Sequence, residues 1–224
     1  MDPLLEKEFD LRLQLPNHAL FVGASMSGKT QLALRLLLAS PDCLQPPPKT
    51  ILFYYDQWQD EYESVKTTLA TRGTTMVIRQ GGGSLTLDEL EKQPHQTLVV
   101  IDDASEETSS SADIAKIATN GRHKNISLWL IWHSLFSKHP ASRVISQNVG
   151  YYFLMPSARL TSQIHSLDTQ LRMRGALLSA YSRAIAQEDW QERYLLLDLA
   201  TTTPAEFRLR SRVLSPEVQV VYMS

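Results

Sequence analysis

The sequence contains almost no cysteine and no long apolar run. Cys43 is the single cysteine among 224 residues, so an internal disulfide framework is excluded and the composition fits a reducing compartment. No apolar run reaches the roughly 18 residues needed to span a bilayer, and the acidic, mixed stretch MDPLLEKEFDLRLQ is not a signal peptide. We therefore expect a soluble, intracellular protein with no membrane segment.

The sequence also lacks an excess of charge of either sign. The formal net charge is -2, from 22 Lys and Arg against 24 Asp and Glu, so a single chain has no overall basic field. Any contact with nucleic acid must then come from local loops or from several subunits acting together.

Short β-branched or aromatic runs alternate with segments of helical period, which is typical of an α/β fold with a mainly parallel sheet flanked by helices. Strands are expected at residues 19–23, 50–55, 75–79, 97–102, 126–132, 151–155 and 194–199. Helices are expected at residues 29–40, 88–93, 112–120 and 160–187, the last interrupted near Gly175. Residues 1–224 should form one domain, with an N-terminal extension at 1–17 and a C-terminal strand or tail at 200–224.

The segment GASMSGKT, after the first expected strand, matches the phosphate-binding pattern G-x-x-x-x-G-K-[ST]. Its glycines let backbone N–H groups turn toward phosphates, and the start of the next helix adds the positive end of its dipole. Lys29 would reach the β and γ phosphates, and Thr30 would ligate Mg²⁺. The pattern therefore predicts a site for ATP and Mg²⁺, formed by Gly23, Ala24, Ser25, Met26, Ser27, Gly28, Lys29, Thr30 and Gln31.

A second acidic element follows the apolar run TLVVI, where Asp102 and Asp103 come at the carboxyl end of a strand. Ligands of open α/β sheets bind at this edge. We expect Asp102 to hold Mg²⁺ through water. Asp103 is a candidate general base for the attacking water, and the alternative is an N-cap of the next helix; the pair of acids favours the base.

The strand at 126–132 ends in the polar pair His133 and Ser134. In ATPases with an additional strand between the strands carrying the phosphate loop and the acidic pair, the RecA-like type, this end senses the γ-phosphate. His133 is therefore a candidate sensor, and an imidazole that only satisfies a backbone group fits the sequence equally well. The histidines show no metal-ligand spacing, so no zinc site is expected.

Several segments together resemble the genome-packaging ATPases of poxviruses, adintoviruses and Maverick/Polinton elements, a branch of the FtsK/HerA superfamily. The resemblance covers nearly the whole chain and rests on LFVGASMSGKT, ILFYYDQWQDEY, VVIDDAS, GRHKNISLWLIWHSLF, ASRVISQNVGYYFLMPSARLTSQI and RYLLLDLATTTPAEFRLR. The block from Gly121 to Ile164 is the most specific part, because the family has a G-[RS]-H-[HK]-N-[IL]-S entry to this strand.

The resemblance implies a motor that uses ATP to push double-stranded viral DNA into a preformed capsid. Such motors act as homo-oligomeric rings, commonly hexamers, at a capsid or portal vertex. The protein would then work at the host-cell site of virion assembly, in the nucleus or the cytoplasm, or travel with the virion. The alternative function is a nucleotide-gated module for ring assembly or capsid docking, with weak ATP turnover because of Asp103 and His133.

Two departures from the family pattern concern the chemistry. The family has Gln where this chain has His133, and a Lys-Asn-Pro-Arg-Asp run where this chain reads PSARL, which keeps only Arg159. Arg159, after a strand end, is a candidate arginine finger for a neighbouring subunit, and Arg143 is the second candidate. The alternative for each arginine is a solvated side chain or a surface ion pair.

Two basic segments are candidates for DNA contact. Arg122, His123 and Lys124 occupy a loop that a ring would repeat around a channel, and the alternative is a solvated turn. FRLRSR places Arg208, Arg210 and Arg212 on one face of a strand, where exposed arginines need no ligand.

Overall fold

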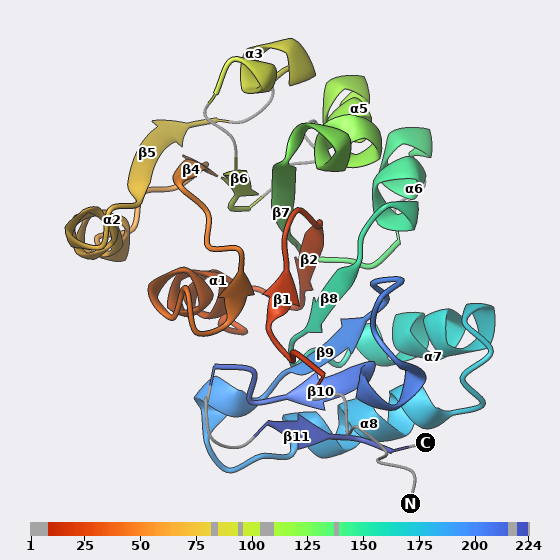
Figure 1. Cartoon of the computed structure of the whole chain (residues 1–224). Helices are drawn as coiled ribbons and strands as arrows, with labels where there is room; N and C mark the ends of the chain where they lie inside the picture. The colour runs from red at the N-terminus through yellow and green to blue at the C-terminus, as the bar shows by residue number, and fades with distance from the viewer. Residues whose placement is uncertain are drawn as a thin grey trace, which may run out of the picture.

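The computed structural model describes residues 9–81, 85–93, 96–103, 110–136, 139–214 and 219–223. Within these ranges a nine-stranded sheet has the order β11-β10-β9-β8-β2-β7-β6-β4-β5 (Figure 1). The six strands from β5 to β8 are parallel, and β9, β10 and β11 are added antiparallel. The strands are β2 (Ala19–Val22), β4 (Thr50–Tyr55), β5 (Thr75–Gln80), β6 (Thr97–Ile101), β7 (Ile126–Trp132), β8 (Tyr151–Leu154), β9 (Leu195–Asp198), β10 (Leu209–Ser211) and β11 (Val220–Val221). A separate short pair joins β1 (Leu13–Gln14) to β3 (Leu44–Gln45).

Helices cover both faces of the sheet, and each face has its own apolar core. Helices α1 (Lys29–Leu38) and α2 (Glu61–Thr71) pack on one face, to the left in Figure 1. The other face carries α3 (Leu87–Glu91), α5 (Ala112–Asn120), α6 (Pro140–Gln147), α7 (Leu160–Gln170) and α8 (Ala176–Ile185). Connections in the described ranges contain the 3-10 helices η1 (Gly121–Lys124), η2 (Trp190–Glu192) and η3 (Ala205–Phe207). In the described part of the chain, no helix has the length and apolar character that crossing a membrane requires.

All seven expected strands are present, each within two residues of its predicted bounds. Strand β7 lies between β2 and β6, which is the arrangement of the additional-strand, RecA-like P-loop fold. The break in the last predicted helix is also confirmed, since Gly175 separates α7 from α8 with a φ of 90°. A capping box begins α3, with the hydroxyl of Thr86 accepting from the N–H of Glu89 at 3.3 Å.

Helix α6 was not predicted. It has eight residues, of which Ser142 and Ile145 are buried, so its apolar period is too short to stand out. The local signal is Pro140 at the start of the helix, where a missing N–H costs nothing, preceded by His139, whose Nδ1 accepts from the N–H of Ala141.

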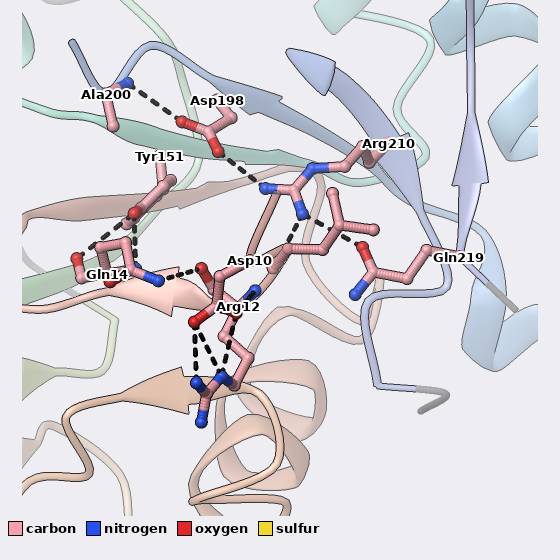
Figure 2. Close-up of polar contacts among 9 residues, drawn as sticks. Asp10, Arg12, Gln14, Tyr151, Asp198, Ala200, Arg210 and Gln219 are labelled. Atoms are coloured by element: carbon pink, nitrogen blue, oxygen red, sulfur yellow. Dashed lines mark hydrogen bonds and ion pairs between the residues drawn. The ribbon is translucent and has the colours of Figure 1, made fainter. Parts of the chain in front are cut away.

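The expectation of an exposed arginine strip at FRLRSR is wrong for Arg210. This side chain is 1% exposed, and its Nη2 lies 2.7 Å from Oδ2 of Asp198 on β9. The same guanidinium group also donates to the carbonyl of Leu11 at 2.5 Å and to Oε1 of Gln219 at 3.1 Å. Figure 2 shows Arg210 between Asp198 and Gln219. Alternation along a strand predicts exposure only where nothing covers the sheet, and here Leu11 and Gln219 lie over β10.

Candidate nucleotide-binding site

The phosphate-binding loop joins β2 to α1, and two glycines give it its shape. A Cβ atom added to Gly23 would lie 2.6 Å from Cβ of Met155 and 2.7 Å from Oγ of Ser27, so a side chain does not fit there. Gly28 has a φ of 88°, a left-handed conformation that glycine adopts without steric cost. The loop therefore turns tightly at the carboxyl end of β2, and α1 begins directly after it without an acidic residue in its first turn.

Lys29 is the first residue of α1, and its side chain turns back into the loop. Its Nζ atom donates hydrogen bonds to the carbonyls of Gly23, at 3.0 Å, and Ala24, at 2.7 Å. Burial lowers the pKa of Lys29, while the charges of Asp103 and Asp102 act in the opposite direction. A bound phosphate would offer this ammonium group a charged partner, which binds more strongly than a carbonyl.

Asp102 follows β6, and both of its carboxylate oxygens are held. The hydroxyl of Thr30 donates to Oδ1 at 2.8 Å, and the hydroxyl of Tyr62 donates to Oδ2 at 2.6 Å. Burial raises the pKa of Asp102, and the bonds from Tyr62 and Thr30 oppose this shift because they stabilise the ionised form. The structure thus brings together the two residues predicted to bind metal, and it adds Tyr62 as their neighbour.

The oxygen atoms around Asp102 fit a magnesium ion. Mg²⁺ prefers oxygen donors, and at nucleotide sites it takes one or two protein ligands together with substrate phosphates. Thr30 and Asp102 supply such donors side by side. In the same loop, Oγ of Ser27 is buried and has no hydrogen-bond partner among the described residues. The residues present therefore suit a phosphate and metal site, in which Thr30 and Asp102 would hold the ion.

Asp103 and His133 contact each other directly. Oδ1 of Asp103 lies 2.8 Å from Nε2 of His133, and the two side chains are 53% and 50% exposed. Asp103 has a φ of 55°, a conformation that turns the chain sharply after Asp102. The first acid is therefore buried toward Thr30, whereas the second faces the open edge, where water has access.

The loop after β7 is supported by a residue that the sequence did not indicate. Oε1 of Gln163, on α7, accepts hydrogen bonds from the hydroxyl of Ser134 at 3.0 Å and from the N–H of Leu135 at 2.7 Å. Gln163 thus fixes the position of the chain directly after His133. Nothing local in the sequence distinguishes it from other polar residues of an exposed helix face.

The two candidate finger arginines lie outside this cluster. Arg159 is exposed at the N-terminal end of α7, just beyond the carboxyl end of β8, as predicted. Arg143 is exposed midway along α6, in the connection between β7 and β8. Within the described part of the chain, neither arginine forms an ion pair.

A hollow of about 270 Å³ adjoins the phosphate-binding loop on the outer side of α1. Gln31, Glu61, Met155, Trp190 and Gln191 are among its lining residues. The indole ring of Trp190 comes within 3.6 Å of a Cβ atom built on Gly28, and this ring is 54% exposed. A flat aromatic surface therefore stands beside the loop, where a nucleoside attached to bound phosphates could lie.

The predicted DNA-contacting residues are found at the other edge of the sheet. Arg122, His123 and Lys124 are exposed in η1, immediately before the amino end of β7. They form a 3-10 helix where a loop was expected. Nζ of Lys124 lies 3.4 Å from Glu91, so part of the positive charge is compensated locally.

No protein-family model and no curated protein matches the chain. Among solved structures, it is similar to the ATPase DotB of Legionella pneumophila, with 12% identity, a TM-score of 0.42, and coverage of 72% of this chain and 52% of that chain. For the cytoplasmic domain of the type VII secretion ATPase EccC of Thermomonospora curvata, the identity is 18% and the TM-score 0.41. The match covers 61% of this chain and 20% of that chain. For the N-terminal domain of zonular occludens toxin from Neisseria meningitidis, the identity is 14% and the TM-score 0.37. The match covers 64% of this chain and 78% of that domain's chain. The chain thus spans about half of DotB and a fifth of the EccC chain, and the likeness concerns the fold alone.

Proposed function

We propose that this chain is a Mg²⁺-dependent ATPase that moves double-stranded DNA into a viral capsid as part of a ring. The observation that carries the ATPase assignment is the convergence of Lys29, Thr30, Asp102, Asp103 and His133 at one edge of the sheet. These side chains come from α1 and from the carboxyl ends of β6 and β7. A phosphate loop, a metal-binding acid and an exposed acid next to an imidazole are the groups that nucleotide hydrolysis requires.

Each residue has a distinct task in this proposal. Lys29 binds the β and γ phosphates, and Thr30 and Asp102 hold the metal. When bound, Mg²⁺ neutralises charge on the phosphate oxygens. Asp103 accepts a proton from the attacking water through Oδ2, while Nε2–H of His133 donates to Oδ1 and fixes the carboxylate.

The nucleoside occupies the hollow beside the loop. The ring of Trp190 stacks on the base, since aromatic faces bind planar bases with little geometric cost. Gln31 and Gln191 supply amide groups that can hydrogen-bond the edge of a base. ATP is the nucleotide that we propose.

Completion of the site requires a second subunit. Among the described residues of the nucleotide cluster, Lys29 is the one cation in hydrogen-bonding contact with the loop. Arg159 is exposed at the same edge as the loop and is free of ion pairs in the described ranges, so it can approach the nucleotide of a neighbour. Arg143 is the second candidate. A ring, commonly a hexamer in the family that the sequence resembles, would supply this contact at every interface.

Cargo and location follow from the sequence resemblance. The cargo is double-stranded DNA, the docking partner is a capsid or portal vertex, and the place is the host-cell site of virion assembly. The alternative is a nucleotide-gated assembly or capsid-docking module. It is favoured by the short reach of Asp103 and by the direct Asp103–His133 contact, which engages the proposed base before any nucleotide is present.

ATP turnover with and without duplex DNA separates these functions, on material whose assembly state is measured in parallel. A motor should hydrolyse ATP faster when DNA is added. An assembly module should bind ATP and change its oligomeric state, with weak turnover that DNA leaves unchanged. Absence of ATP binding would overturn both.

A further inference from the structure

A second hollow, of about 720 Å³, lies where α7 turns into α8. Its lining includes Arg172 and Arg174 from the turn, Arg183 from α8, Arg208 from the segment before β10, and Tyr222. Helix α7 starts beyond the carboxyl end of β8, so its far end approaches the amino edge of the sheet. Strand β9 ends at this same amino edge, because its last residue, Asp198, pairs with Tyr151, the first residue of β8. The hollow is therefore at the edge opposite the phosphate-binding loop.

The hollow concentrates positive charge. Four of its lining residues are arginines, and none of the described residues that line it is acidic. No ion pair involves these four arginines in the ranges that the structure describes. The guanidinium group of Arg183 lies over the ring of Tyr222 at 5.2 Å, and Nε of Arg208 is buried with no hydrogen-bond partner among the described residues. Like charges held together repel each other, so this arrangement is suited to an anionic ligand.

The turn between α7 and α8 has an uncommon backbone. Arg172 and Arg174 have φ values of 56° and 54°, and Gly175 follows at 90°. Left-handed conformations suit glycine and asparagine, whereas a long side chain there is strained. Two arginines nevertheless occupy such positions on either side of Met173. At Arg172 the left-handed turn ends α7, and the N–H of Met173 donates to the carbonyl of Asp168 at 3.0 Å.

We propose that this arginine hollow binds phosphate groups of a nucleic-acid backbone. Guanidinium groups match phosphate oxygens with paired hydrogen bonds, and several such groups would follow successive phosphates. The hollow also shares its edge of the sheet with Arg122, His123 and Lys124, because η1 precedes the amino end of β7. Both segments belong to the same face, since α5, α7 and α8 contribute to one apolar core. Both lie away from the ATP site, and this inference rests on the proposed function in taking duplex DNA as the cargo.

The test is binding of a fluorescein-labelled DNA duplex, followed by anisotropy over a range of salt concentrations and without ATP. The double variant Arg172→Asn, Arg174→Gly removes two charges and introduces residues that suit the left-handed backbone. A plot of the logarithm of the association constant against the logarithm of salt concentration has a negative slope. Loss of two phosphate contacts should make this slope less steep by roughly 1.8 and weaken binding by about 10- to 100-fold near 0.1 M salt. The thermal unfolding midpoint should not fall.

Two further variants control for net charge and for geometry. The double variant Lys66→Gln, Arg79→Gln removes the same charge from α2 and β5, and it should bind duplex DNA like the wild type. Arg172→Lys, Arg174→Lys keeps the charge but loses the forked donors, so its salt slope should stay near that of the wild type. Labelled poly-glutamate serves as the competing probe for an acidic protein partner.

The possible failures are distinguishable. Equal duplex binding by the Asn/Gly variant and the Lys66, Arg79 control would overturn this inference and leave the motor proposal standing. Loss of poly-glutamate binding alone in the Asn/Gly variant would assign the hollow to an acidic protein instead. No duplex binding by wild-type protein of any assembly state would overturn the DNA motor itself.

Discussion

The hydroxyl group of Tyr62 donates a hydrogen bond of 2.6 Å to Oδ2 of Asp102, on the side of the carboxylate away from Thr30. Tyr62 is fully buried near the start of α2, and its ring packs 4.7 Å from that of Phe53 on β4. The bond therefore links the proposed metal-binding acid to a helix that follows a different strand. A movement of α2 would therefore shift the hydrogen bond to Asp102.

Replacing Tyr62 with Phe should weaken Mg²⁺ binding by about 10- to 100-fold, the usual effect of losing a partner behind a metal ligand. The change also removes a bond that lowers the pKa of Asp102, so more of the carboxylate would be protonated. Mg²⁺ should be titrated in the presence of a non-hydrolysable nucleotide, with the change in tryptophan fluorescence as the signal. Tyr55→Phe, in the same aromatic cluster, is the matched control. An unchanged Mg²⁺ midpoint in Tyr62→Phe would show that the tyrosine only packs.

Lys29→Ala should weaken ATP binding by about 10- to 100-fold, because a charge-assisted hydrogen bond to phosphate contributes roughly 1.5–3 kcal/mol. ADP, which lacks the γ phosphate, should lose less. Calorimetric titration of both nucleotides measures the difference, with Lys66→Ala as a control for general loss of charge. Wild-type affinity in Lys29→Ala would contradict the assignment of the phosphate site.

Asp103→Asn should bind ATP normally but lose hydrolysis, since an amide cannot take a proton from water. A single-turnover measurement with the pre-bound nucleotide separates this effect from binding. If hydrolysis continues at the wild-type rate, Asp103 is not the base.

His133→Gln should retain ATPase activity, because the amide N–H₂ can replace the imidazole as a donor to Asp103. His133→Ala offers no donor, so its turnover should fall while ATP binding remains. Comparison of kcat and KM for the two variants gives the answer. Equal kcat values for His133→Ala and wild type would reduce the contact to a surface interaction.

His18 should make the fold sensitive to acid. It is buried, its Nδ1 accepts from the N–H of Leu128 at 3.0 Å, and burial together with the charge of Arg122 lowers its pKa to about 3. In the unfolded chain its pKa is near 6.5, so the unfolded state takes up the proton first as pH falls. The free energy of unfolding should then decrease by about 1.4 kcal/mol per pH unit below pH 6.5, down to about pH 3. Urea unfolding at several pH values should show this slope in wild type and in His165→Asn, an exposed control, but not in His18→Asn.

The central sheet and the phosphate-binding loop could be predicted from the sequence because their signals are local. Buried parallel strands are continuous apolar runs, and the loop places its glycines, lysine and threonine at fixed spacing. The Tyr62–Asp102 bond could not be predicted in this way, since 40 residues separate the partners and their meeting depends on how α2 packs. The Asp103–His133 contact was similarly hidden, although both residues were singled out separately at strand ends.

The error at Arg210 has a related cause. Alternation along a strand tells which face a side chain lies on, but not whether another segment covers that face. Arg210 is covered by Leu11, far away in the sequence, and by Gln219. The arginine hollow could not be predicted from the sequence, because its four arginines are far apart along the chain. They are Arg172 and Arg174 in a turn, Arg183 in a helix and Arg208 in a later segment. Only the packed structure brings them to one place.

The bond from Arg210 to the carbonyl of Leu11 joins residues that are 199 positions apart. During synthesis on the ribosome, the segment around Leu11 cannot bind β10 until Arg210 has emerged. Strands β2 to β8 and their helices lie earlier in the chain, so the parallel part of the sheet can assemble while β9 and β10 are still absent. Until then β8 has an open edge, which is a pairing site for other strands. Strand β9 closes that edge by pairing with β8, so a chain stalled on the ribosome before Leu195 would leave β8 exposed.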